Sequence, residues 1–337
     1  MRGATDVDIA AGLLRLEDRR EYDEAFIAAA AGHAGPDVRR RAALAAGRIR
    51  DRRGIPALGR LLGDADTAVA AAAAFGLGQM GDTAAVPLLA PYVSADRIAR
   101  APTVVGEAAY AIAKLQHPQA RAALERLLRE AEEGPGAREA VGSALLGIWR
   151  QGRPLPVDAI SPWLQADDAE LRWRAAYSLA RRADPRGTAA LFPAAGDADP
   201  LVRSFVARSL TKAMADSAGI PADEALSALL QMVRAPEQPV RINAIRSLGT
   251  YEHVRSVFAL NDLVTQTRDP HAAITAAESL QRLGTKAVYG SSGLRTVATD
   301  ARRPVFLRTT ALIALADVVP HEALEIADAF ARESGWR

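Results

Sequence analysis

The sequence contains no cysteine, only three lysines among its 337 residues, and 5% aromatic residues. The lack of cysteine excludes disulfide-stapled secreted domains, cysteine-ligated metal sites and cysteine nucleophiles, and leaves the redox compartment open. Few aromatic residues and 74 alanines are unsuited to a β-sandwich or a large α/β core. They suit closely packed helices, because alanine has the highest helix propensity. We therefore expect an all-α protein.

Acidic and basic residues are nearly balanced, with 42 Lys plus Arg against 40 Asp plus Glu, so the net charge identifies no partner. Residues 1–24 carry charges throughout and lack the apolar stretch of a secretory signal. The longest uncharged window, Thr67 to Gly81, is shorter than the roughly 20 apolar residues that span a bilayer. We expect a soluble, cytoplasmic protein without membrane contact, or a periplasmic one if a signal precedes the given start.

A repeat is present along nearly the whole chain. An apolar anchor residue recurs about every 34 residues, and the residues four and eight positions after it are apolar or small. This spacing forms one face of a helix. The nine anchors are Val38, Val69, Val104, Ala137, Leu171, Val202, Val240, Ala272 and Leu307.

Each repeat unit is predicted to be a pair of helices. Asp199 and Asp269 each precede a proline, a pattern that caps a helix and starts it. Glycines near the helix ends suit a left-handed cap or a close helix contact. A single pair cannot bury its apolar face, so stacked neighbours must complete the core. These glycines are Gly47, Gly78, Gly249 and Gly284, and the clearest second helices are Ile55 to Leu62, Val86 to Tyr92, Ala120 to Leu128 and Leu226 to Val233.

The pattern D-x-x-V-R-x-x-A-x-x-x-L-G marks the anchored helices. It is matched by Asp199, Val202, Arg203, Val206 and Leu210, and more loosely by Asp66, Val69, Ala73, Leu77 and Gly78. It resembles the short prokaryotic HEAT repeat, including the type found in phycobilin lyases, over roughly residues 20 to 333. The resemblance implies a right-handed α-solenoid, an armadillo-like superhelix of about nine HEAT-type helix pairs.

The same resemblance implies a ladder of ion pairs between neighbouring repeats. Arginine follows the anchor in six units, and an acid lies three residues before the anchor in five. We expect these arginines to be structural rather than ligand-binding. The arginines are Arg39, Arg138, Arg172, Arg203, Arg241 and Arg308, and the acids are Asp66, Asp168, Asp199, Glu237 and Asp269.

The repeats predict three regions. Residues 1–35 form N-terminal capping helices, residues 36–319 form the solenoid, and residues 320–337 form a C-terminal capping helix that completes the array. In that last helix Leu324, Ala327 and Phe330 share one side. Small and helix-breaking residues over 213–221 predict a loop or hinge.

No motif predicts catalysis. Gly76, Gly78 and Gly81 satisfy G-x-G-x-x-G, but an alanine-rich helix precedes them where a dinucleotide site needs a strand. The five histidines are scattered without metal-ligand spacing. Paired acids such as Asp64 and Asp66 lie at helix starts, where capping explains them. The run over 290–293 misses the spacing of a nucleophile elbow. We expect no enzyme, cofactor or metal.

The positions two, six and ten residues after each anchor are predicted to face outward together, and in HEAT arrays they line the concave side. They hold eight basic and three acidic residues. Since aromatic and arginine side chains anchor interfaces, we predict that this face binds a partner and that Trp173→Ala weakens binding more than folding. The predicted binding residues are Arg40, Arg48, Phe75, Tyr110, Lys114, Trp173, Tyr177, Arg181, Arg208, Lys212, Arg246 and Arg282.

The sequence favours a non-catalytic scaffold that binds a protein partner with acidic character. A nucleic-acid partner is the second reading, with Arg208, Lys212, Arg246 and Arg282 as a track for phosphates. A bilin-lyase-like protein is a third. The fourth is the scaffold part of a bacterial HEAT protein that continues into a cyclophilin-type prolyl isomerase domain, because residues 14–49 resemble the N-terminal HEAT region of such proteins. The oligomeric state stays open.

Overall fold

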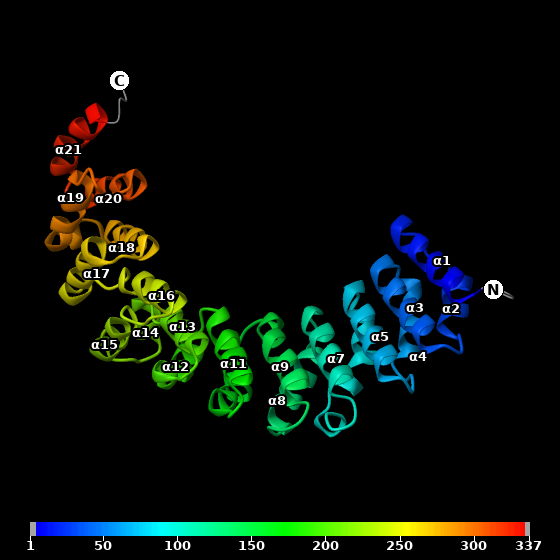
Figure 1. Ribbon diagram of the computed structural model, residues 1–337. Coiled ribbons are helices and arrows are strands. Elements are labelled where there is room, and N and C mark those ends of the chain that lie inside the picture. The colour runs from blue at the N-terminus through cyan, green and yellow to red at the C-terminus, as the bar shows by residue number, and fades with distance from the viewer. Residues whose placement is uncertain (1–4, 334–337) are drawn as a thin grey trace. The chain divides into compact units, whose positions relative to one another are not determined.

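The computed structural model describes residues 5–333, and within this range the chain forms helices and turns without a strand (Figure 1). The prediction of an all-α fold is confirmed. The chain divides into two compact units, Met1–Arg182 and Ala183–Arg337. Each unit is a stack of helix pairs, as the repeat predicts.

In unit 1 the first helices of the pairs lie side by side in one layer, and the second helices form another layer (Figure 1). The first layer is α1 (Asp6–Arg19), α3 (Pro36–Ile49), α5 (Thr67–Met80), α7 (Pro102–Lys114), α9 (Ala137–Gly147) and α11 (Ala169–Arg181). The second layer is α2 (Glu24–Ala31), α4 (Ile55–Leu61), α6 (Val86–Leu89), α8 (Pro118–Glu130) and α10 (Val157–Ile160). Short 3-10 turns extend several of these helices, among them η5 (Ile148–Gln151) after α9.

Unit 2 repeats this arrangement. Its anchored helices are α13 (Pro200–Ser209), α16 (Gln238–Leu248), α18 (Pro270–Leu283) and α20 (Val305–Val318). The others are α12 (Pro185–Leu191), α14 (Lys212–Ser217), α15 (Ala222–Met232), α17 (Val254–Gln266), α19 (Ser291–Thr299) and α21 (Pro320–Glu333), with 3-10 turns η7 (Phe192–Gly196) and η8 (Gly284–Gly290).

The predicted core positions are confirmed in every repeat. All nine anchors are buried, and so are all residues four and eight positions after them. Asp199 and Asp269 cap α13 and α18 through the backbone N–H groups of Leu201 and His271. The four predicted second helices are present as α4, α6, α8 and α15. The hydrophobic period therefore specified the stacking face correctly.

Two of the predicted helix-end glycines lie inside helices instead. Gly47 belongs to α3 and Gly78 to α5, and neither is a cap. A Cβ atom on Gly78 would lie 2.7 Å from the Cβ of Ala111 in α7. These glycines serve the alternative role of close helix contact, whereas Gly284 caps α18 with a positive φ of 55°.

The ladder is confirmed for four of its six arginines, with one change of partner. Arg138 pairs with Asp168 at 2.8 Å, Arg203 with Glu237 at 2.9 Å and Arg241 with Asp269 at 2.7 Å. Arg39 pairs with Asp64 at 2.7 Å rather than with Asp66, which caps α5. A recurring set of bonds also ties several of these arginines to carbonyls five and six residues earlier, as Arg39 does with Ala34 and His33.

Two predictions in unit 2 need correction. Lys212–Ser217 forms the helix α14, so the loop prediction for 213–221 was wrong over that stretch, while its role as a hinge stays a prediction. In α21 Leu324 is 72% exposed and Ala323 is the buried residue. The buried face of α21 is therefore shifted by one residue from the predicted face. Ala327, which was predicted to lie on that face, is half-buried. The side chain of Phe330 lies outside the described part of the structure.

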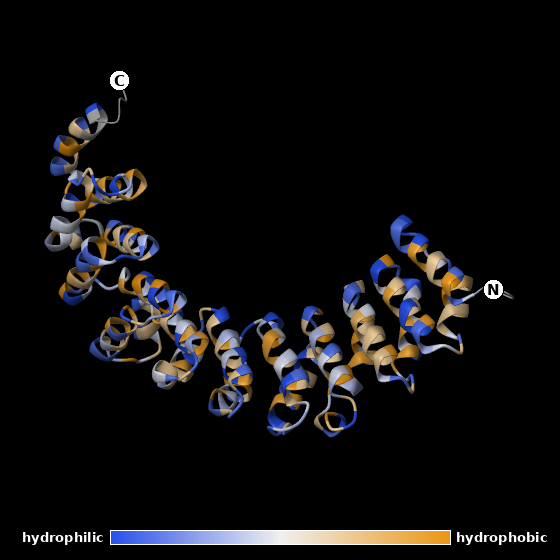
Figure 2. Cartoon of the chain, viewed as in Figure 1, coloured by the Kyte–Doolittle hydropathy of each residue, from blue (hydrophilic) through white to orange (hydrophobic). Residues whose placement is uncertain are grey.

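The helices mix hydrophobic and hydrophilic residues along their lengths (Figure 2). Among the described residues, no helix combines the length and the apolar character needed to cross a bilayer.

Candidate functional site

The positions predicted to face outward keep at least partial exposure, with four exceptions. Ala71, Gly106, Gly147 and Ser204 are buried, so the prediction was wrong for them. The neighbouring helix comes too close: a Cβ atom on Gly106 would lie 2.5 Å from the Glu139 carbonyl oxygen. All eight basic and all three acidic residues of these positions remain exposed or half-buried.

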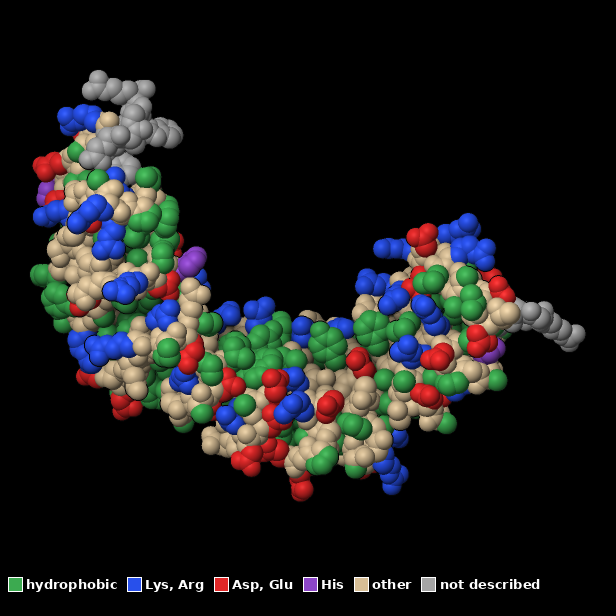
Figure 3. Space-filling view, in the orientation of Figure 1, with side chains coloured by type: hydrophobic (Ala, Val, Ile, Leu, Met, Phe, Trp, Pro, Cys, Tyr) green, Lys and Arg blue, Asp and Glu red, His purple; other side chains and the backbone are tan. Residues whose placement is uncertain are grey.

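The structure brings five of the twelve predicted binding residues together. These are Phe75, Tyr110, Lys114, Tyr177 and Arg181, all in unit 1. They come from the C-terminal halves of α5, α7 and α11, which lie in one layer (Figure 1). Figure 3 shows hydrophobic and basic side chains next to one another on this part of unit 1.

The first half of this site is built around Lys114. Its Nζ lies 4.3 Å from the ring centre of Tyr110 and 5.9 Å from that of Phe75. The guanidinium carbon of Arg150 lies 5.9 Å from the same Tyr110 ring. Cations at these distances are attracted by the negative faces of the rings.

The second half of the site is built around Trp149, which lies in the 3-10 turn η5 directly after α9. The guanidinium carbons of Arg150, Arg181 and Arg182 lie 4.7, 4.9 and 5.9 Å from its ring centre. The Tyr177 ring meets the Trp149 ring edge-on, with centres 6.3 Å apart and planes at 82°. We call the four rings and four cations the strip; its members are Phe75, Tyr110, Lys114, Trp149, Arg150, Tyr177, Arg181 and Arg182.

The sequence did not predict Trp149, Arg150 or Arg182 as site residues. Counting in steps of a continuous helix misses Trp149 and Arg150, because α9 ends at Gly147 and the chain continues in the 3-10 turn η5. Arg182 directly follows the end of α11. Trp149 Nε1 and Arg150 Nη1 both donate to the Leu146 carbonyl, at 2.9 and 3.1 Å. These bonds satisfy the end of the helix and direct both side chains. The one available signal was the Trp-Arg pair directly after an anchored helix.

The strip cations lack carboxylate partners. Within residues 5–333, none of the four forms an ion pair. Burial lowers the pKa of Lys114, Glu107 opposes that shift, and Arg150 and Arg50 add to it. Burial also raises the pKa of Glu107, which weakens it as a counter-charge. The ladder arginines, in contrast, have their charge balanced by acids.

Trp173 lies outside the strip. It is half-buried in the N-terminal half of α11, about 6 Å along the helix axis from Tyr177. Its ring contacts the guanidinium of Arg174 at 5.3 Å. Arg174 in turn donates to the Arg138 carbonyl at 2.9 Å and pairs with Glu170 at 3.0 Å. The Nε1 of Trp173 is buried and has no hydrogen-bond partner in the described part of the chain.

The remaining predicted residues are dispersed. In unit 1 Arg40 is exposed and Arg48 pairs with Glu17 at 2.8 Å. In unit 2 Lys212 pairs with Asp216, and Arg282 donates to the carbonyl of Arg246 at 3.1 Å. Arg208 and Arg246 are exposed there. Lys212 therefore has an acidic partner already, unlike the strip cations.

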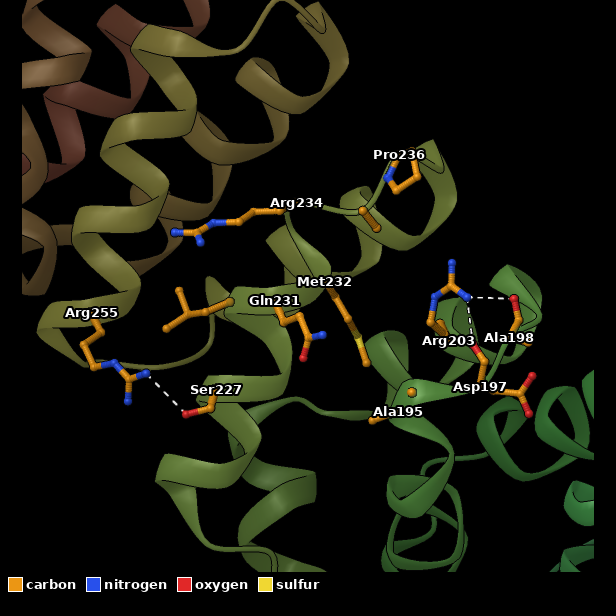
Figure 4. A pocket seen from close by; sticks show the side chains of 13 residues that line it. Ala195, Asp197, Ala198, Arg203, Ser227, Gln231, Met232, Arg234, Pro236 and Arg255 are labelled. Carbon is orange, nitrogen blue, oxygen red and sulfur yellow. Dashed lines mark hydrogen bonds between the residues drawn. The ribbon is translucent and has the colours of Figure 1, made fainter.

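Unit 2 has an open groove of about 820 Å³ between η7, α15 and α17 (Figure 4). Its floor includes Met232, and three arginines reach its edge. Arg203 donates to the carbonyls of Asp197 and Ala198 at 2.7 and 2.9 Å, and Arg255 donates to Ser227 Oγ at 3.3 Å (Figure 4). Because Arg203 also pairs with Glu237, this groove has less unbalanced charge than the strip.

Comparison with protein families gives two matches. The family described as HEAT repeats matches residues 24–104, 157–232 and 226–316, well over half of the chain. The PBS lyase HEAT-like repeat matches residues 104–130. No curated protein matches significantly.

Solved structures of similar fold include YibA of Escherichia coli, with 17% identity, a TM-score of 0.54, and coverage of 77% of this chain and 90% of that one. Human deoxyhypusine hydroxylase in complex with glycerol has 18% identity and a TM-score of 0.34, with coverage of 92% and 99%. At this identity the likeness to YibA shows the fold alone.

Proposed function

The chain belongs to the HEAT-repeat family, and on that premise we propose that it is a non-catalytic scaffold that binds an acidic segment of a protein partner through the strip. The observation that carries the proposal is the set of four strip cations that lie against aromatic rings and form no ion pair with a carboxylate of residues 5–333. Solenoids present extended surfaces of this kind to extended partners.

The environment of the cations makes an acidic ligand favourable. Lys114, Arg150 and Arg182 are half-buried, so their charges are less screened by water than those of exposed side chains. A carboxylate that approaches them forms charge-assisted hydrogen bonds, which are about twice as strong as neutral ones. The rings supply rigid apolar area beside the charges, and arginine and aromatic residues dominate the binding energy of interfaces.

Nucleic acid is the alternative partner. In its favour, Lys114, Arg150 and Arg181 come from neighbouring helices and resemble a track for phosphates. Against it, binding of single strands depends on bases that stack on open aromatic faces. Here cations already lie against the rings of Tyr110 and Trp149. We therefore favour recognition of carboxylates over recognition of bases.

The test is binding of the full chain to a pool of glutamate-rich peptides with randomised flanking residues, measured by fluorescence anisotropy. The double variant Arg150→Gln/Arg181→Gln is expected to weaken binding at least about tenfold, as loss of two charge-assisted bonds implies. The matched control is Arg208→Gln/Arg246→Gln, which removes two exposed arginines of unit 2. A control that weakens binding as much as the strip variant would contradict the proposal, as would tighter binding of a single-stranded oligonucleotide of equal charge.

A further inference from the structure

The three guanidinium groups around Trp149 form a concentrated site of positive charge. Each guanidinium carbon lies within 6 Å of one ring centre, so any two are at most about 11 Å apart. We propose that this cluster, Arg150, Arg181 and Arg182 around Trp149, binds the phosphate group of a phosphorylated side chain on the protein partner. This inference rests on the proposed function and specifies its ligand.

Two of the three groups are held in place by the backbone. Arg182 Nε donates to the Trp149 carbonyl at 2.7 Å, and Arg150 Nη1 donates to the Leu146 carbonyl at 3.1 Å. Each guanidinium has five N–H donors, so both keep several for a ligand. Groups that are oriented before binding lose less entropy when the ligand arrives. The side chain of Arg181 is exposed and makes no hydrogen bond within the described residues, so all its guanidinium donors are available.

The charge of the cluster fits a phosphate monoester better than a carboxylate. Three positive groups that have no acidic partner in the described part of the chain carry more charge than the single negative charge of a carboxylate balances. A phosphorylated side chain carries about −1.5 to −2 charges at neutral pH and three strong acceptor oxygens. Arginine binds such oxygens with two parallel hydrogen bonds. A nucleic-acid phosphodiester carries one charge, and its bases would compete with Arg150 and Arg181 for the Trp149 ring.

The neighbouring strip residues define where the rest of the partner lies. Lys114 and Arg150 both contact the Tyr110 ring, so the positive charge continues from the cluster towards α7. An extended segment whose phosphate sits at Trp149 would place its acidic residues along Tyr110 and Phe75. The geometry therefore points to a phosphorylated residue within an acidic stretch.

The experiment compares a degenerate phosphoserine peptide pool with its unphosphorylated counterpart on the full chain. The wild type is expected to bind the phosphorylated pool at least about tenfold more tightly, the strength of one charge-assisted bond. Arg181→Gln is expected to remove that difference in affinity, because all the guanidinium donors of Arg181 are available for the phosphate. Since Arg181 is exposed, its loss leaves the fold intact. Arg208→Gln, an exposed arginine of unit 2, is expected to preserve it. Thermal unfolding of each variant checks that it is folded.

Four outcomes would overturn the inference. Equal binding of both pools would show that carboxylates suffice, and the acidic-segment function would stand without it. Inorganic phosphate that competes as well as the peptide would assign the site to free phosphate. A single-stranded oligonucleotide that displaces the peptide at lower concentration would assign it to nucleic acid. Failure of both peptide pools to bind would remove the proposed function as well.

Discussion

Gly47 of α3 and Gly76 of α5 bring two helix backbones into direct contact: a Cβ atom on Gly47 would lie 2.4 Å from the Cα of Gly76. Both residues are buried inside their helices. Contacts of this kind explain the glycines inside these helices, because no residue with a Cβ atom fits where two backbones approach so closely. The G-x-G-x-x-G motif that contains Gly76 is therefore a packing feature.

Gly47→Ala is expected to destabilise unit 1 by about 1 to 3 kcal/mol, because the new methyl group meets backbone that cannot move without separating α3 from α5. The higher helix propensity of alanine offsets part of this loss. Urea unfolding measures the change. Gly63→Ala is the control in the same unit, since its nearest atom would lie 3.6 Å away. Equal stability of the two variants would contradict the packing role of Gly47.

Asp64→Asn is expected to cost about 2 kcal/mol at neutral pH, because Arg39 loses a bidentate ionic partner at 2.7 and 2.8 Å. The hydrogen bond from Arg39 holds the pKa of Asp64 below its ordinary value of 3.8. The stabilisation is therefore present above about pH 4 and is lost as the pH falls through the lowered pKa. Unfolding free energies at neutral pH and at about pH 2 measure it.

The gap in stability between wild type and Asp64→Asn should close in acid. Asp37→Asn provides the control, because Asp37 is exposed in the first turn of α3 and forms no ion pair within the described residues. A gap that persisted unchanged at low pH would mean that the substitution acts through packing rather than charge.

The burial of the Tyr251 hydroxyl predicts that the protein loses stability in alkaline solution. It is 1% exposed, its hydroxyl donates to the Leu210 carbonyl at 3.0 Å, and burial raises its pKa to about 12. Below about pH 10 the hydroxyl is neutral in both states. Between about pH 10 and pH 12 it ionises only in the unfolded chain, so stability falls by about 2 kcal/mol.

Tyr251→Phe should flatten this part of the pH profile, measured by urea unfolding at several alkaline pH values. It should also lower stability by about 1 kcal/mol at neutral pH through the lost hydrogen bond. Tyr289→Phe is the control, because Tyr289 is 75% exposed. An alkaline slope that survives in Tyr251→Phe would refute the assignment.

Glu107→Gln is expected to increase the affinity for acidic peptides about threefold at low salt. The substitution removes a negative charge that partly cancels the attraction of Lys114 for an acidic ligand. The gain should disappear at high salt. Folding should be unaffected or improved, since burial already disfavours the charged form of Glu107. Glu139→Gln, an exposed acid of α9, should leave the affinity unchanged. Weaker binding by Glu107→Gln would argue that the strip does not select negative charge.

Trp149 of the strip and Trp173 outside it are both half-buried, but their replacement should affect peptide binding to different degrees. Trp149→Ala is expected to weaken acidic-peptide binding about tenfold, because three arginines lie against its ring. Among the described residues the Trp173 ring has a cation contact with Arg174 alone, so Trp173→Ala should weaken binding less. Anisotropy titrations at a temperature where both variants are folded measure this. A larger loss for Trp173→Ala would move the site towards the N-terminal half of α11.

The ladder shows how far local pattern alone could predict contacts. Arg138 and Asp168 lie 30 residues apart, yet their pairing followed from their positions in neighbouring repeats. The pairing of Arg39 with Asp64 did not, because two acids stood near the same helix start and the backbone decided which one caps it. Leu324 failed for a different reason: within the described residues α21 packs against α19 and α20, and Ala323 rather than Leu324 is the side chain buried there.

The sequence by itself determined the all-helical repeat, its nine anchors and the residues that stack, because these depend on helical period and hydrophobicity within each short segment. Only the tertiary structure decided which residues come together in the strip. Phe75, Lys114, Trp149 and Arg181 come from four different repeats, and their contact depends on how closely the helices approach. It also depends on the 3-10 turn after α9, which redirects Trp149 away from the regular helical face. Both are set by packing between distant segments, and no local pattern encodes them.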